Sequence, residues 1–187
     1  MTEIEVPLEK LQQDLEHAAT HGDHGSQQNW VTWSALLSAL LAVLAAVAAL
    51  QAGHQINEAM LNQLKASDTW SFFQAKSIKS NITETRSQIL QGLGKTADAN
   101  LEKKLAQYAD EQKELKHQAE TLESTSKAHF HKHEVFATAV TFFQISIAVT
   151  AIAVLARRRN FLLVAGSFGA VGIYFLITAF LLGGGGH

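Results

Sequence analysis

Residues 54–134 read HQINEAMLNQLKASDTWSFFQAKSIKSNITETRSQILQGLGKTADANLEKKLAQYADEQKELKHQAETLESTSKAHFHKHE, and this polar stretch lies between uncharged apolar runs. Its strong helix breaker is in the middle, at Gly92-Leu93-Gly94, where glycine tolerates the positive φ that ends a helix. The parts before and after the breaker have equal length, so two helices return the chain to the level it left. The sequence therefore predicts a helical hairpin over residues 54–134, with its turn at 92–96.

The second half of the stretch repeats apolar and small residues in steps of four and three, the spacing of a left-handed coiled-coil contact face. These positions are Leu101, Leu105, Tyr108, Gln112, Leu115, Ala119, Leu122, Ser126, His129 and His133. The large apolar residues that predict the contact face of the first half are less regular: Ile56, Met60, Leu64, Ile78, Ile82 and Ile89. Antiparallel pairing about the turn predicts that Ile56 lies near Lys132 and Trp70 near Gln118.

The apolar residues outside this stretch gather in uncharged runs at 31–52, 135–156 and 161–182. Each run exceeds the about 20 residues that a membrane-spanning helix needs. We therefore expect an all-α membrane protein with three transmembrane helices and a long antiparallel coiled-coil hairpin between the first and second. Residues 1–29 are predicted to form an acidic, histidine-containing amphipathic segment, and residues 183–187 are predicted to form a tail.

Composition limits the classes of function. The 187 residues are 47% hydrophobic, which is too apolar for a disordered chain, and they contain no cysteine, which excludes disulfide and thiolate chemistry. The net charge of −2 and the lack of an Arg/Lys cluster with interleaved aromatic residues argue against nucleic-acid binding. No nucleophile and base fall together in the sequence. We therefore expect no enzymatic activity and no cofactor.

The short turn Arg157-Arg158-Arg159 joins the second and third apolar runs. Basic residues in short loops stay in the cytoplasm, so the rule predicts a cytoplasmic turn and a hairpin on the outer, periplasmic side. Lys127 and Lys132, which flank the second run, argue for the opposite orientation.

Small side chains in the apolar runs predict close helix packing, because transmembrane helices associate where their backbones approach. These residues are Ser34, Ser38, Ala42 and Ala46 in the first run and Gly166 and Gly169 in the third. One copy offers few helices to cover these faces, so we expect a homo-oligomer within the lipid bilayer.

An aromatic group lies halfway along the first half of the hairpin. Its bulky members have small or polar predicted neighbours, which favours contact with another subunit or partner. The expected interface residues are Trp70, Phe72, Phe73, Gln74 and Lys76, and a ligand groove is the alternative.

Several segments together resemble a bacterial membrane-protein family known as domain of unknown function four-three-three-seven. They are EVPLEKL at 5–11, AGHQINEA at 52–59, ASDTWSFFQAKSIK at 66–79 and the turn around Arg157-Arg158-Arg159, and the third is the specific one. The resemblance covers the whole chain. It implies a multi-pass protein of the bacterial inner membrane and supplies no activity.

The second apolar run contains the polar residues Thr138, Thr141, Gln144, Ser146 and Thr150; Gln144 lies near its middle, and Gln144 and Thr141 are the candidate polar site. An amide in hydrocarbon needs a hydrogen-bond partner, so these residues predict either an interhelical contact or the lining of a pore. The apolar runs contain no Asp, Glu, Lys, Arg or His, which argues against proton-coupled transport.

Histidines gather where the hairpin meets the second apolar run. His129 and His133 share a face, and the hairpin brings His54 and Glu58 to the same level. Such a group suits either a divalent metal or a pH response, although packed or solvated histidines are the simpler interpretation, and no metal site is firmly predicted.

These patterns favour a homo-oligomeric structural or scaffolding assembly in the membrane. The alternatives are a passive channel lined by the second transmembrane helix and a pH- or metal-responsive sensor that uses the juxtamembrane histidines. Other protein partners are not indicated by the sequence.

Overall fold

The computed structural model describes residues 24–94 and 99–183, and its elements there are all α-helices: α2 (His24–Gly92), α3 (Ala99–Leu155) and α4 (Asn160–Gly183). The all-α prediction is confirmed for this part of the chain. Most of the predicted acidic N-terminal segment (1–29) and of the tail (183–187) lies outside the described residues.

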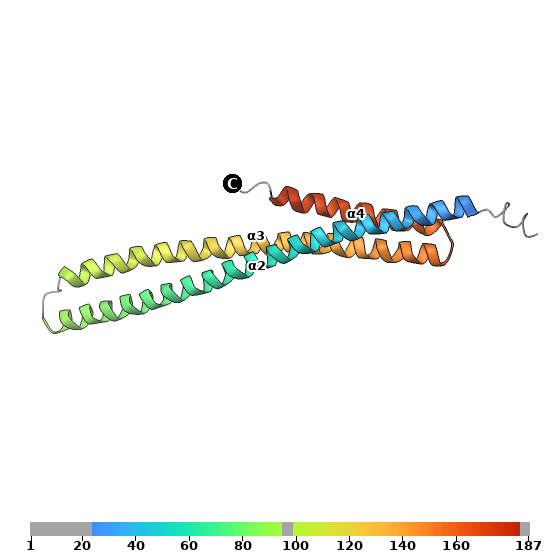
Figure 1. Cartoon of the computed structure of the whole chain (residues 1–187). Coiled ribbons are helices and arrows are strands. Elements are labelled where there is room, and N and C mark those ends of the chain that lie inside the picture. Colours follow the sequence, from blue (N-terminus) through green and yellow to red (C-terminus); the bar gives the residue numbers. More distant parts are fainter. Residues whose placement is uncertain (1–23, 95–98, 184–187) are drawn as a thin grey trace, which may run out of the picture.

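The helices form a long rod (Figure 1). α2 and α3 lie side by side in opposite directions from the turn near Gly94 to the far end, and α4 packs beside the final part of α3. The buried apolar core lies where the three helices meet, and it includes Leu41, Ala48, Phe136, Phe143 and Leu176. α2 is continuous through Gly53, so the same helix contains both the first apolar run and the first half of the polar stretch.

The side of α2 that faces α3 follows an unbroken repeat in steps of four and three, which we call the α2 seam. Every member is buried or half-buried. Its members are Ser34, Ser38, Leu41, Ala45, Ala48, Ala52, Gln55, Ala59, Asn62, Ala66, Thr69, Phe73, Lys76, Ser80, Thr83, Ser87 and Leu90. This is the spacing that lets two helices stay in contact over a long distance. Most of these side chains are small.

The facing side of α3 has the same spacing. All the predicted contact positions from Leu101 to His133 are buried or half-buried, and the repeat continues through Phe136, Val140, Phe143 and Ile147. Large side chains of α3 therefore pack against small ones of α2 along most of the rod.

The predicted contact face of the first half is wrong except at Ile56, which is half-buried. Met60, Leu64, Ile78, Ile82 and Ile89 are 58–63% exposed and point away from α3. The physical reason is the division of volume between the two helices: α3 supplies the large side chains, which leaves room for alanine and serine on α2. The register at the end of the apolar part also differs from the prediction: His129 contacts Gln55, whereas pairing of Ile56 with Lys132 would place Gln55 opposite His133, four residues further on.

The ends of the helices are closed by backbone hydrogen bonds. After α2 ends, Gly94 takes a φ of 70°, a conformation that glycine adopts without strain. After α3, Arg157 takes a φ of 53°, with Arg157 N–H bonded to Val154 O and Arg158 N–H bonded to Ala153 O. These two bonds are those of a Schellman motif, which satisfies carbonyl groups at the end of a helix.

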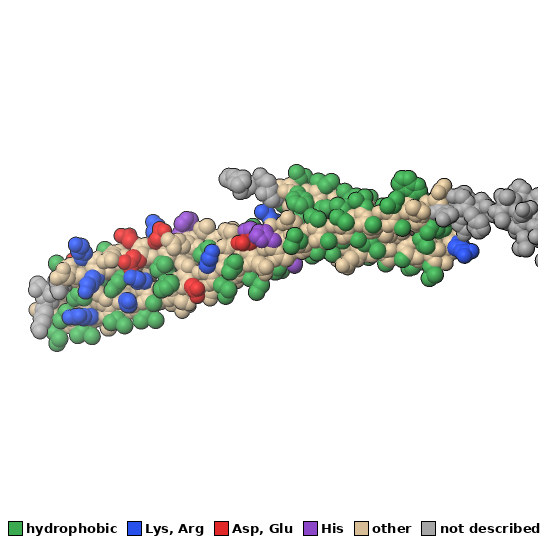
Figure 2. Space-filling model, in the orientation of Figure 1, with side chains coloured by type: hydrophobic (Ala, Val, Ile, Leu, Met, Phe, Trp, Pro, Cys, Tyr) green, Lys and Arg blue, Asp and Glu red, His purple; other side chains and the backbone are tan. Residues whose placement is uncertain are grey.

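Each described helix contains a stretch long and apolar enough to cross a membrane, as judged by length and composition. Figure 2 shows the separation along the rod: charged side chains gather on the part near the α2–α3 turn, whereas the part that contains α4 is free of them on this face up to the α3–α4 turn. This distribution is compatible with a membrane protein.

α4 packs closely on α3. Ser146 Oγ donates a hydrogen bond to Ala165 O at 2.7 Å, and the ring of Phe136 meets that of Phe180 edge-on at 5.3 Å between centroids. Gly172 provides the closest approach, because a Cβ placed there would lie 2.8 Å from Cδ1 and Cε1 of Phe143.

We predict that Gly172→Ala destabilises the fold by about 1–3 kcal/mol, the usual cost of overpacking a filled core. The ring of Phe143 is fully buried, so an added methyl group at Gly172 would force packed side chains to shift. Unfolding in mixed detergent, followed by circular dichroism, measures the change.

The matched control is Gly166→Ala on the same helix, where an added Cβ meets nothing within 4 Å. Here we expect no loss, and a gain of up to about 1 kcal/mol from helix propensity. Equal stability of the two variants would contradict the packing described at Gly172.

Candidate functional site

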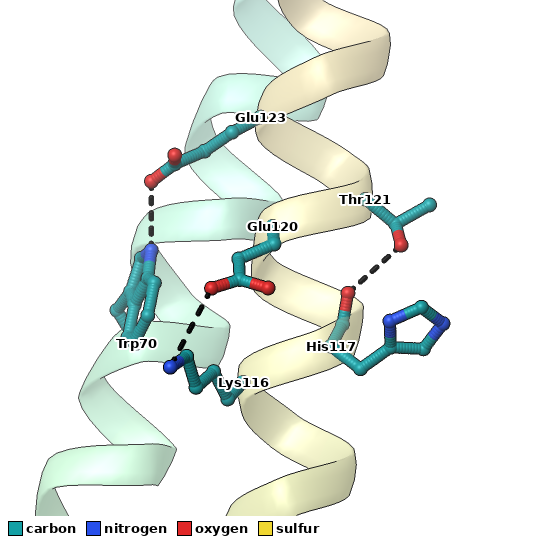
Figure 3. A network of polar contacts seen from close by, with 6 residues as sticks. All are labelled: Trp70, Lys116, His117, Glu120, Thr121 and Glu123. Carbon is teal, nitrogen blue, oxygen red and sulfur yellow. Dashed lines mark hydrogen bonds and ion pairs between the residues drawn. The ribbon is translucent and has the colours of Figure 1, made fainter.

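A tryptophan connects the two long helices halfway along the polar part of the rod. Trp70 Nε1 of α2 donates a hydrogen bond to Glu123 Oε1 of α3 at 2.7 Å (Figure 3). A carboxylate acceptor makes this bond stronger than one between neutral groups. The other contacts drawn in Figure 3, Lys116 with Glu120 and Thr121 with the His117 carbonyl, lie within α3. Trp70 is therefore a contact within one chain.

The predicted interface residues divide between two sides of α2. Trp70, Phe73 and Lys76 are half-buried on the side of α3, and the rings of Trp70 and Phe73 meet edge-on at 5.4 Å. Phe72 is 65% exposed, and Gln74 is also exposed. Sequence reasoning missed Glu123 as the partner of Trp70. Its position directly after Leu122 of the α3 contact face is the signal that could have found it.

Lys76 is the centre of a second contact between the helices. Its Nζ pairs with Glu111 Oε2 and lies 5.5 Å from the centroid of the Tyr108 ring, while Gln107 Nε2 donates to Glu111 Oε1 at 2.9 Å. The hydrogen bond from Lys76 and that from Gln107 lower the pKa of Glu111 below its usual range. An open groove of about 520 Å³ lies here, lined by Lys76, Asp110, Glu111, Glu114 and Leu115.

Three hydrogen bonds join α3 to α2 where the apolar part of the rod ends, and we call them the boundary clasp. His133 Nδ1 lies 2.9 Å from Ala52 O, and His129 Nδ1 lies 2.7 Å from Gln55 Oε1. Ser126 Oγ donates to Ala59 O at 2.7 Å and is buried. The alanines have no bulk to keep α3 away, so its side chains reach the backbone carbonyls of α2.

The hydrogen bonds of the boundary clasp bear on the predicted role of the histidines in a pH response or in metal binding. A carbonyl oxygen only accepts, so His133 donates through Nδ1, and protonation at Nε2 leaves that bond in place. His54 is exposed and Glu58 is half-buried. Within residues 24–94 and 99–183, no three His, Cys, Asp or Glu side chains form a group able to hold a metal. The histidines of the clasp therefore serve as donors between helices.

The predicted small-residue positions do not share one face. Ser34 is buried and bonds its own helix at Val31 O, and Ser38 is half-buried, whereas Ala42 and Ala46 are exposed. A step of four residues turns about 40° further round the helix each time, so an i+4 series leaves the contact face.

The two glycines predicted in the third apolar run also differ in their surroundings. Gly169 packs against Ser146 and Leu41, while Gly166 faces open space.

Gln144 and Thr141 differ in their hydrogen bonding. Thr141 Oγ1 donates to Ala137 O of its own helix at 3.0 Å. Gln144 is exposed, and its amide has no hydrogen-bond partner among the residues that the structure describes. The polar group that joins α3 to α4 is instead Ser146, two residues further on.

We predict that the Lys76–Glu111 pair stabilises the fold at neutral pH and loses its effect in acid. Because the pKa of Glu111 is lowered on folding, the contribution is present above the ordinary value of 4.5 and is lost as the pH falls through the folded-state value. A double-mutant cycle of Lys76→Met and Glu111→Gln, measured by thermal unfolding at pH 7 and pH 3, tests this.

The control cycle uses Lys116 and Glu120, which are more exposed and 3.8 Å apart. Exposed pairs of this kind contribute little, so this cycle should show the smaller coupling at pH 7. A Lys76–Glu111 coupling that is unchanged at pH 3 would show that packing of the side chains, and not their charges, is responsible.

Comparison with known proteins identifies the family. The model of a family described as Domain of unknown function (DUF4337) matches residues 30–182, which contain the described parts of all three helices except their outermost residues. No match was found among curated proteins or solved structures. The match covers most of the chain, and the chain therefore belongs to this family of unknown function.

Proposed function

We propose that this protein is a subunit of a homo-oligomeric scaffold in the bacterial inner membrane. In this proposal, the apolar parts of α2 and α3 together with α4 span the bilayer, and the polar parts of α2 and α3 project from it as an antiparallel coiled-coil hairpin. The role is structural, with no enzymatic step and no cofactor.

The observation that carries the proposal is the unpaired amide of Gln144. The residue lies within the apolar part of α3, and its side chain is exposed on the surface of the single copy. In hydrocarbon, a polar group without a partner costs several kcal/mol. A second copy supplies the simplest partner, because a primary amide both donates and accepts hydrogen bonds and so can pair with its own copy.

The surroundings of Gln144 suit close approach by another helix. Thr141, Ala148 and Ala151 are exposed on successive turns of the same side of α3. A groove of about 500 Å³ lies beside them between α2 and α3, lined by Val31, Ser34, Ala35, Ser38, Thr150, Ala151, Val154 and Leu155. Small side chains favour association of membrane helices because they let the backbones come near each other.

A contact between the ends of the apolar stretches supports one orientation of the protein in the membrane. The guanidinium of Arg159 lies 5.9 Å from the ring of Trp30, so the start of the apolar part of α2 and the basic α3–α4 turn are at one level. Tryptophan and arginine are both typical of the membrane–water interface, and basic short turns stay in the cytoplasm. We propose that this end is cytoplasmic and that the hairpin is periplasmic.

A passive channel is the second candidate, and the same residues favour it. In a ring of copies, Thr141 and Gln144 would line a neutral polar path through the membrane. The proposed scaffold and the channel differ in what Gln144 contacts: a neighbouring amide in the first and water in the second.

We predict that Gln144→Leu weakens self-association by about 0.6–2 kcal/mol, the usual contribution of a hydrogen bond between membrane helices. This corresponds to a roughly three- to thirty-fold rise in the dissociation constant. Energy transfer between labelled copies, diluted stepwise in liposomes, measures the constant, and the particle mass in detergent gives the number of subunits.

Ile145→Leu is the control, because Ile145 is the exposed neighbour of Gln144 and carries no polar group. It should leave the dissociation constant unchanged. A protein that has the mass of one subunit, or a Gln144→Leu variant that associates as the natural chain does, would overturn the proposal. Conductance through liposomes that changes in Gln144→Leu would favour the channel.

A further inference from the structure

Large apolar side chains are exposed on α2 on both sides of Asp68 and Ser71, beyond the apolar part of the rod, and we call them together the outer stripe. Its members are Leu61 (49% exposed), Leu64 (62%), Phe72 (65%), Ile78 (60%), Ile82 (63%) and Ile89 (58%). In Figure 2, hydrophobic side chains are visible along the α2 edge of the part of the rod where charged side chains gather. Monomeric proteins in water rarely expose so long an apolar band, and one that does usually has a partner.

The outer stripe lies on the side of α2 opposite to α3. Leu64 and Ile78 are each two residues from seam members on both sides, which is about 200° round the helix, and Leu61, Ile82 and Ile89 flank this line. No rotation of α2 can therefore bury both sides against α3. The outer stripe must be covered by something outside this chain's pair of helices.

The facing partner is a helix with an apolar side. From Ala75 to Ile89, the exposed positions Ala75, Ile78, Ile82, Thr85 and Ile89 follow steps of four and three, the spacing of a helix–helix contact. An open hollow of about 460 Å³ lies on this segment, lined by Asn81, Ile82, Thr85, Arg86, Ile89 and Leu90. Such a hollow receives a side chain of a neighbouring helix.

The other surfaces of the rod do not match the outer stripe. Between residues 99 and 134, the part of α3 described beyond the apolar run, Phe130 is the exposed large apolar side chain, and the rest of the outer face is mostly charged or polar. Among the surfaces of the described residues, the stripe of a second copy is thus the matching one. A contact in which the same surface meets itself has two-fold symmetry.

We propose that two copies of the chain pair through their outer stripes, with their α2 helices parallel and a two-fold axis along the membrane normal. This rests on the proposed function, because insertion of both copies in one orientation is what makes the α2 helices parallel. α2 continues without a break from the apolar run into the stripe. The stripe therefore projects away from the bilayer and meets a neighbouring α2 at the same height.

The natural chain has no cysteine, so a single introduced cysteine reports contact between copies. Ile82→Cys places one on the outer stripe. Lys104→Cys is the control, because Lys104 is exposed on α3 at about the same distance from the Lys76–Glu111 pair. Both full-length variants are reconstituted in liposomes and oxidised with copper phenanthroline, and dimers are measured on non-reducing gels.

We expect Ile82→Cys to form the disulfide-linked dimer at least about tenfold faster than Lys104→Cys, because pairing raises the effective concentration of the two thiols. The Ile78→Cys variant should form disulfide-linked dimers with itself, and so should the Ile89→Cys variant. A mixture of the two, with one of them tagged, should give no mixed dimer above the Lys104→Cys background, since parallel copies keep these positions on different turns. Preferential mixed dimers would show antiparallel pairing and overturn the inference.

Equal rates for Ile82→Cys and Lys104→Cys would also overturn it. The particle mass and the Gln144→Leu measurement then separate the two proposals. If the particle still contains several copies that respond to Gln144→Leu, only the stripe pairing fails. If the particle is a single subunit, the proposed function fails as well.

Discussion

The contact between α2 and α3 is the interaction on which the rest of the structure depends. It keeps one spacing from Ser34 to Leu90, through the apolar and the polar parts of the rod, and α2 contributes mainly small side chains to it. Alanine recurs at every seventh position of this side, as Ala45, Ala52, Ala59 and Ala66, and all four are buried. Close approach at these alanines is what allows His133 and Ser126 of α3 to reach the backbone carbonyls of α2.

Much of the fold could be predicted from the sequence because its signals are strong. The long uncharged runs and the repeat of Leu101 to Leu122 lie in the helices as expected, and Gly94 lies in the turn after α2. The matching side of α2 could not be predicted by a search for large apolar residues, because its members are alanine, serine and threonine. The recurrence of alanine at every seventh position is the signal in the sequence that marks this side of α2. The isoleucines of the same helix instead favour another side as the predicted contact face.

The polar positions were harder to predict because each depends on how a helix is rotated. Gln144 and Ser146 are two residues apart and so point to opposite sides of α3. Phe143 and Ser146 pack against Gly172 and Ala165 of α4, which turns the amide of Gln144 outwards. The sequence identified a histidine pair at His129 and His133. Their acceptors were a glutamine side chain and a main-chain carbonyl, which carry no pattern of their own.

The side of α2 that faces away from α3 has two parts: one lies in the apolar run, and the other lies among charged side chains. Next to the α2 seam in the apolar run, Leu40, Val43, Val47 and Leu50 are exposed on the single copy, and acyl chains cover such residues in a bilayer without cost. Beyond the run the charged side chains begin, and after the polar His54 and Asn57 the same side of α2 carries the apolar residues of the outer stripe. Exposure of apolar surface to water costs roughly 25 cal/mol of free energy for each Å². In the proposed arrangement, a protein surface takes the place of lipid where the bilayer ends, and the unpaired amide of Gln144 meets a partner inside the bilayer. Both features follow from a seam that uses the small side chains of α2 and leaves its large ones outside.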